Sequence, residues 1–187
     1  MKFRAFSLIA ALALFAGCSH SHYADDDFVA SAHALQPSVV LLSMDVPGET
    51  KKSAPDSEFA TGTVVASGAW GSDILTVEHA IEQAWNLRVT IGNKDKYPGR
   101  VIASNNSLDI ALVRVKRPNL PVATLGTAEH AMPGRTIGLI GYPIPDQFDD
   151  EGLGLATSLN SGRVSSIRDN AIEVTVPIVP GESGSPV

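Results

Sequence analysis

The feature that most constrains this chain is a series of short β-branched runs separated by turn signals. The runs are four to nine residues long, and pairs such as Pro47-Gly48 and Pro98-Gly99 fall between them. With 17 Val, 12 Ile and 10 Thr, the chain is rich in side chains that pack well on a pleated sheet. The pattern therefore predicts an all-β fold. The candidate strands are Ser38–Val46, Phe59–Ala66, Asp73–Val77, Leu87–Ile91, Arg100–Ala103, Ile110–Lys116, Thr136–Tyr142, Ser161–Ile167 and Ala171–Ile178.

The spacing of these strands predicts two successive antiparallel β-barrels. Six candidate strands come first, a connection containing Pro and Gly follows, and three more strands complete the chain. We therefore expect an N-terminal β-barrel over 37–118, an inter-barrel linker over 119–134 and a C-terminal β-barrel over 135–187. Helical periodicity is weak, and the best candidate is a short turn from His79 to Ala84.

The N-terminus has the pattern of an export signal. Residues 1–17 begin with Lys2 and Arg4, continue with an apolar stretch too short to span a bilayer, and end in small residues directly before Cys18. The segment resembles a bacterial lipoprotein signal, in which that Cys is lipidated and anchors the protein to a membrane. An ordinary secretory signal with a chance Cys is the alternative. We interpret 18–36 as the lipidated Cys and a polar tether.

Charge and cysteine content exclude several classes of function. The formal net charge of −6 argues against nucleic acid as a partner. No apolar run of membrane-spanning length follows the N-terminal segment. Cys18 is the only cysteine, so an exported domain would contain no internal disulfide. His20 and His22 lie near three aspartates, but no spacing typical of a zinc site supports a metal, and no cofactor is expected.

Three motifs place chemically useful side chains in a fixed order. In ILTVEHAIE (74–82) an apolar strand ends at His79, and in LDIALVRV (108–115) Asp109 directly precedes a strand. In GESGSPV (181–187) Ser183 lies between glycines, which allow backbone N–H groups to turn toward one point. Each motif alone is compatible with a purely structural residue; the ordered set is the informative observation.

With these motifs the chain resembles the trypsin-like serine proteases, most closely the bacterial HtrA/Deg-type branch. The resemblance covers about 37–187 and includes TGTVVASG (61–68), GYPIP (141–145) and SLNSGRVSSI (158–167). It implies two chymotrypsin-type barrels and cleavage of protein or peptide substrates through an acyl-enzyme intermediate. By position, Ser183 matches the nucleophile, His79 the general base and Asp109 the residue that orients the His. The N–H groups of Gly181 and Ser183 match the oxyanion hole.

The chain departs from the family pattern around the nucleophile and at its end. Ser185 replaces a usual Gly, and Glu182 stands where Asp or Asn is commoner. The sequence stops at Val187, so we expect an incomplete second barrel and little activity from a chain of this length. The first hypothesis is an exported serine endopeptidase of the bacterial cell envelope, lipid-anchored and facing the periplasm. The alternative is a non-catalytic binding lipoprotein on a protease-like scaffold.

Overall fold

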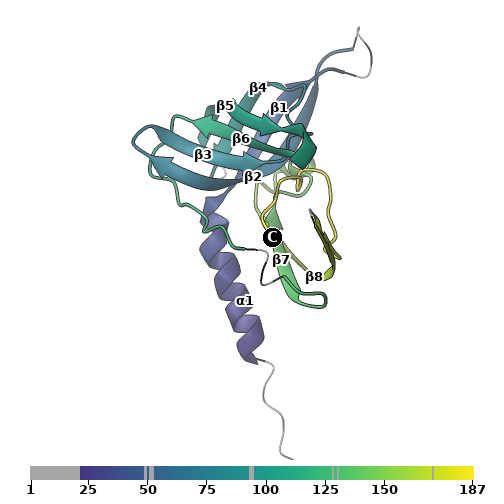
Figure 1. Ribbon diagram of the computed structural model, residues 1–187. Helices are drawn as coiled ribbons and strands as arrows, with labels where there is room; N and C mark the ends of the chain where they lie inside the picture. Colours follow the sequence, from purple (N-terminus) through teal and green to yellow (C-terminus); the bar gives the residue numbers. More distant parts are fainter. Residues whose placement is uncertain are drawn as a thin grey trace, which may run out of the picture.

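A computed structural model describes residues 22–48, 50, 53–92, 95–127, 129, 131–169 and 171–187. Strands dominate these residues, as the sequence predicts, and Figure 1 shows them in two groups. The helical elements are α1 (His22–Leu35), η1 (Gln36–Ser38), η2 (Asn106–Leu108) and α2 (Pro145–Asp150). The strands are β1 (Val39–Val46), β2 (Asp56–Gly68), β3 (Gly71–Thr76), β4 (Trp85–Ile91), β5 (Asp95–Asn105), β6 (Ile110–Val115), β7 (Thr136–Gly141), β8 (Ser158–Arg168) and β9 (Ala171–Val174).

The first six strands form a closed antiparallel barrel in the order β1-β2-β3-β6-β5-β4. Strand β1 closes it by pairing with β2 on one side and with β4 on the other. Register shifts interrupt the β1–β4, β2–β3 and β5–β6 ladders. Such bulges bend a strand and let a small sheet curve onto itself. The barrel predicted from the first set of runs is confirmed.

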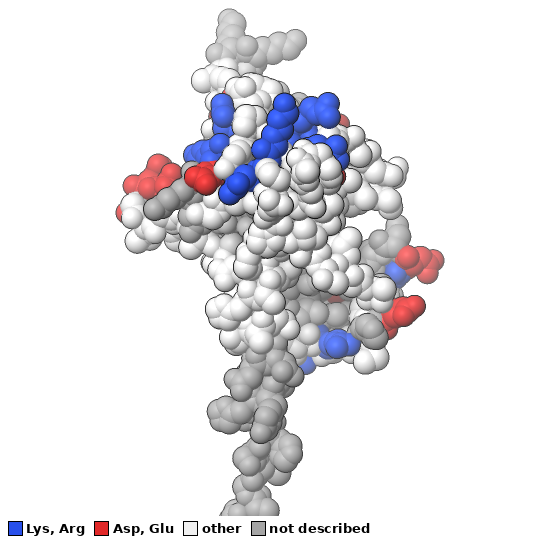
Figure 2. Space-filling view, turned by 90° about the vertical axis from the view of Figure 1, so that its left-hand side faces the viewer, with Lys and Arg blue, Asp and Glu red and all other residues white. Residues whose placement is uncertain are grey.

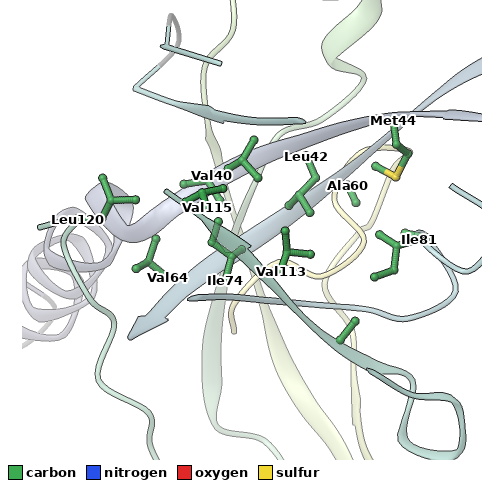
Figure 3. Close-up of a cluster of buried hydrophobic side chains, with 13 residues drawn as sticks. Val40, Leu42, Met44, Ala60, Val64, Ile74, Ile81, Val113, Val115 and Leu120 are labelled. Carbon is green, nitrogen blue, oxygen red and sulfur yellow. The ribbon is translucent and has the colours of Figure 1, made fainter. Parts of the chain in front are cut away.

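The barrel interior is filled by aliphatic side chains that alternate along the strands (Figure 3). Leu42 and Val89 pair across β1 and β4, and both are fully buried. Ala80 and Ile81 come from the turn after β3 and also join this core. Removing a buried Leu or Ile side chain from such a core costs about 2–5 kcal/mol. The core therefore fixes the turn that carries His79.

The second group of strands is a three-stranded sheet in the order β7-β8-β9. Val39 and Leu41 of β1 pack against Ile140 and Tyr142 at the end of β7, so this sheet lies against the outside of the barrel. This packing places the turn that contains Ser183, which follows β9, next to strand β2 of the barrel.

Helix α1 differs from the polar tether expected over this part of the chain. Ala32 and Leu35 pack against the cluster between the barrel and the second sheet, and the Phe28 ring lies against Gly138 of β7. Ala and Leu are strong helix formers, and most helix stability in proteins comes from packing one apolar face. The many Ser, His and Asp residues of this segment made the apolar face of α1 hard to predict from the sequence. Within the described ranges, no helix has the length and apolar character needed to cross a membrane.

The structure also differs from the predicted elements at strand β5 and at helix α2, and it contains the predicted turn after β3. Strand β5 is longer than the predicted run, because Asp95–Pro98 also pairs with β4. The short helix α2 was not predicted; it begins at Pro145, a residue well suited to the first helical turn. The turn predicted at 79–84 contains backbone hydrogen bonds from Ile81 to Glu78 and from Ala84 to Ile81.

Candidate active site

The barrel brings His79 and Asp109 together across paired strand ends. Thr76 of β3 pairs with Ala111 of β6, so the residues just beyond these positions lie side by side. The backbone N–H of His79 donates to Asp109 Oδ1 over 2.8 Å, and His79 Nδ1 lies 2.7 Å from Asp109 Oδ2. Both oxygens of one carboxylate therefore hold the backbone and the ring of the same His.

The hydrogen bonds to Asp109 keep its carboxylate ionised. Burial acts to raise the pKa of Asp109, but the His79 N–H, the His79 ring and the Glu78 backbone outweigh it. The net effect is a pKa of Asp109 below its ordinary value. An ionised carboxylate accepts hydrogen bonds only, so the proton of a neutral His79 lies on Nδ1. Nε2 is then free to act as a base.

A second pair of side chains supports the turn that carries Asp109. This residue follows η2 with φ 50° and ψ 46°, a left-handed conformation that Asp tolerates better than most residues. Asn106 Nδ2 donates to the buried Glu78 carboxylate over 3.2 Å, which joins η2 to the residue before His79. The sequence alone does not indicate this link, because no chemical motif pairs Asn106 with Glu78.

Ser183 lies in a tight turn with two glycines in left-handed conformations. Gly181 has φ +93° and Gly184 φ +83°. A Cβ at Gly181 would collide with the Tyr142 carbonyl, and one at Gly184 with the Thr61 carbonyl. The glycines are therefore required both by backbone conformation and by space.

Thr61 of β2 holds this turn against the barrel. Its N–H donates to the Ser183 carbonyl over 2.8 Å, and its hydroxyl donates to the Gly181 carbonyl over 2.8 Å. The same hydroxyl accepts the N–H of Tyr142 over 3.0 Å. One buried residue thus connects the barrel, the turn and the loop after β7. Its role was not predicted, since a Thr in a strand carries no distinctive signal.

Glu182 is a buried carboxylate between Gly181 and Ser183. The residue is 1% exposed, and its two oxygens accept from Asn160 Nδ2 and from the N–H of Val179, each over 3.0 Å. Its own N–H donates to the Val179 carbonyl over 3.1 Å. The side chain therefore closes the 179–182 turn and ties it to β8. A shorter Asp would reach these donors less readily.

A cavity of about 310 Å³ joins the predicted site residues. His79, Gly181 and Ser183 all line it. The His79 and Asp109 side chains are 59% and 47% exposed, so the pair is open to solvent. No hydrogen bond joins His79 to Ser183 in the described part of the chain; catalytic contacts of this kind are often loose without substrate. The remaining lining comes from Ser57, Glu58, Phe59, Ala80, Pro145, Asp146 and Pro180.

The comparisons with known proteins show the family of this chain. The model of a family described as "Trypsin-like peptidase domain" matches residues 60–187. The chain belongs to this family.

The similar proteins are bacterial members with protease names. A putative serine protease HhoB of Synechocystis is 30% identical over 153 residues, which are 75% of this chain and 34% of that protein. A probable periplasmic serine endoprotease, DegP-like, of Chlamydia pneumoniae is 29% identical over 142 residues, 74% of this chain and 28% of that protein. The chain thus spans about a third of the length of these relatives.

A solved structure shares the fold of this trypsin-like domain. The serine endoprotease of Yersinia pestis superposes with a TM-score of 0.64 and 22% identity, over 84% of this chain and 52% of that one. The likeness agrees with the closed barrel and the second sheet described above. The prediction of a chymotrypsin-type, all-β fold is confirmed.

Ser185 is the departure from the trypsin-like pattern with a visible structural cost. Its φ is not positive, so a side chain is compatible with the backbone there. Its hydroxyl is nevertheless buried without a hydrogen-bond partner among the described residues.

Cys18, the predicted lipidation site, lies outside the described residues. Within those residues, no group of three or more His, Cys, Asp or Glu could hold a metal ion.

Proposed function

We propose that this domain is a serine endopeptidase that acts through His79, Asp109 and Ser183. The observation that carries the proposal is that His79, held by Asp109 through its Nδ1, lines one cavity with Ser183. Membership of the trypsin-like family and the protease names of the relatives support the same activity. Protein or peptide substrates follow from that activity.

In the proposed reaction the Ser183 hydroxyl attacks the scissile carbonyl carbon. Its proton passes to Nε2 of His79, and the imidazolium is stabilised by the carboxylate of Asp109. Collapse of the tetrahedral intermediate breaks the C–N bond, and His79 returns the proton to the leaving amine. An acyl-enzyme remains on Ser183. Water, deprotonated by His79, then attacks the ester. The bond between the acyl carbon and Ser183 Oγ breaks, His79 returns the proton to Oγ, and the acid leaves.

The turn around Ser183 supplies the donors that this mechanism needs for the oxyanion. Among the described residues, the N–H groups of Gly181 and Ser183 have no hydrogen-bond acceptor. The N–H of Glu182, which lies between them, donates to the Val179 carbonyl. Removing one donor from an oxyanion hole typically costs about 2.7–4 kcal/mol of transition-state stabilisation. Both groups are thus available to the substrate.

We also propose that the protein is exported and attached to a membrane through Cys18. The basic start, the short apolar stretch and the small residues before this cysteine support the assignment. Periplasmic names among the relatives agree with an envelope location. In membrane fractionation with a high-salt wash, which screens binding through surface charge, Cys18→Ala is expected to release the protein into the soluble fraction. Unchanged retention of this variant would contradict lipidation at Cys18.

Hydrolysis of fluorescently labelled unfolded casein tests the proposed activity. The protein isolated from its native host is expected to release soluble peptides, and Ser183→Ala is expected to release none. Ser185→Ala is the matched control, because it removes the hydroxyl of a neighbouring serine that does not line the cavity with His79. Equal rates for the wild type and Ser183→Ala would refute the proposal. Absence of hydrolysis in both would favour a non-catalytic binding protein.

A further inference from the structure

Most of the described cationic side chains lie on one face of the barrel. The described residues include nine Lys and Arg, and six of these fall between residues 88 and 117, on or next to β4, β5 and β6. Figure 2 shows Lys and Arg gathered over the upper part of the molecule, where the barrel lies. We call this surface the basic face; it consists of Arg88, Lys96, Arg100, Arg114, Lys116 and Arg117.

The sheet register places these charges close together. Arg100 of β5 is directly opposite Arg114 of β6, and Arg88 of β4 is opposite Pro98, two residues before Arg100. Like charges on facing positions of a sheet are destabilising. The facing Arg100 and Arg114 therefore repel each other, and an external anion bound between them would relieve this repulsion.

Within the described part of the chain, an acidic side chain pairs with one member of the basic face. Asp73 accepts both Arg114 Nε and Nη2, over 2.7 and 2.8 Å. No ion pair involves the other five members within the described residues. Those five are also solvent-exposed. The whole chain carries a net charge of −6, so approach to an anionic surface is favoured electrostatically when the basic face is turned toward that surface.

An aromatic side chain accompanies the charges. Trp70, at the β2–β3 turn, is 49% exposed, and the Arg114 guanidinium lies 4.3 Å from its ring centroid. Arg117 lies 6.0 Å from the Tyr97 ring. Exposed Trp beside Lys and Arg is typical of surfaces that rest at the boundary between water and lipid headgroups.

We propose that the basic face docks on an anionic membrane surface, with lipid phosphates as the groups recognised. The charges lie on the outer surface of a curved sheet, and helix α1, the first described element, runs below them on the same side of the molecule (Figure 2). This interaction does not depend on the proposed catalysis, and it needs no acyl chain.

Vesicle sedimentation tests the proposal on the whole chain. The probes are vesicles of phosphatidylcholine with 40% phosphatidylglycerol and vesicles of phosphatidylcholine alone. The triple variant Arg88→Gln, Arg100→Gln, Lys116→Gln spares the Asp73–Arg114 pair. Each basic residue near an anionic surface contributes about a fivefold change in affinity, so the triple variant is expected to lose on the order of 100-fold for the anionic vesicles. All chains in this test also carry Cys18→Ala, so no acyl anchor contributes to the binding.

A second triple variant controls for net charge. Arg135→Gln, Arg163→Gln and Arg168→Gln remove the same charge from outside the basic face, and are expected to leave anionic-vesicle binding within about threefold of the wild type. Thermal melts of all three chains show whether each is folded. Equal losses in the two variants, or wild-type binding that ignores phosphatidylglycerol content or 0.5 M salt, would overturn the proposal. Binding of the basic face to soluble polyphosphate but not to anionic vesicles would overturn it too.

Discussion

Thr61 and Gly181 are 120 residues apart in sequence, and a hydrogen bond of 2.8 Å joins the Thr61 hydroxyl to the Gly181 carbonyl. The bond is fully buried, since Thr61 has no exposed surface. It fixes the turn that presents Ser183 relative to the barrel that presents His79. This threonine on β2 therefore helps to fix the distance across the candidate site.

Thr61→Val is expected to destabilise the protein and to impair the site. Valine has nearly the same shape, but the Gly181 carbonyl and the Tyr142 N–H would each lose a buried partner. An unsatisfied buried group costs about 1–3 kcal/mol, so the free energy of unfolding should fall by about 2 kcal/mol or more. Chemical denaturation measures this loss. Thr61→Ser keeps the hydroxyl and should retain more stability than Thr61→Val; the reverse order would contradict the role of the hydrogen bonds.

Glu182→Gln is expected to destabilise the turn beside Ser183. Asn160 Nδ2 and the Val179 N–H both donate to Glu182, and an amide can accept from only one of these donors without turning its own NH₂ toward the other. The expected loss is about 1–3 kcal/mol in the free energy of unfolding. Adding Asn160→Asp supplies an acceptor for the new NH₂ and should recover part of this loss. A double variant no more stable than Glu182→Gln would argue against the contact.

The lowered pKa of Asp109 predicts a loss of stability in acid. A group whose pKa is lower in the folded than in the unfolded state stabilises the fold above the unfolded value, about 3.9 for Asp. This contribution disappears as the pH falls through the lower, folded value. Melting temperatures of the wild type and Asp109→Asn should therefore converge as the pH falls from 5 through that range. A difference that stays constant with pH would contradict the assignment.

Asp109→Asn should also lower the rate of peptide hydrolysis far more than it changes stability. The amide can donate to His79 Nδ1, which favours the tautomer with its proton on Nε2 and removes the base. In trypsin-like enzymes this change lowers kcat about 10⁴-fold. Steady-state kinetics on a peptide substrate should show the loss in kcat with little change in KM. A loss confined to KM would indicate that Asp109 acts in binding.

The sequence was informative where local patterns carry the structure. The β-branched runs predicted the strands of the barrel, and the order of the three motifs indicated which side chains could meet. The contacts of Thr61 with Gly181 and of Asn160 with Glu182 could not be predicted, because they depend on the register of strands far apart in sequence. Helix α1 was missed for a similar reason, since its apolar contacts are with the second sheet.

Labelling with a fluorophosphonate probe tests the central claim most directly. The probe forms a covalent adduct with a serine whose hydroxyl is activated by a neighbouring base and whose oxyanion is stabilised. In the protein isolated from its native host, mass spectrometry should locate the adduct on Ser183. His79→Ala should abolish labelling almost as completely as Ser183→Ala, because the residues act as a unit. Labelling of Ser183 that persists undiminished in His79→Ala, or an unlabelled wild-type protein, would contradict the proposed mechanism.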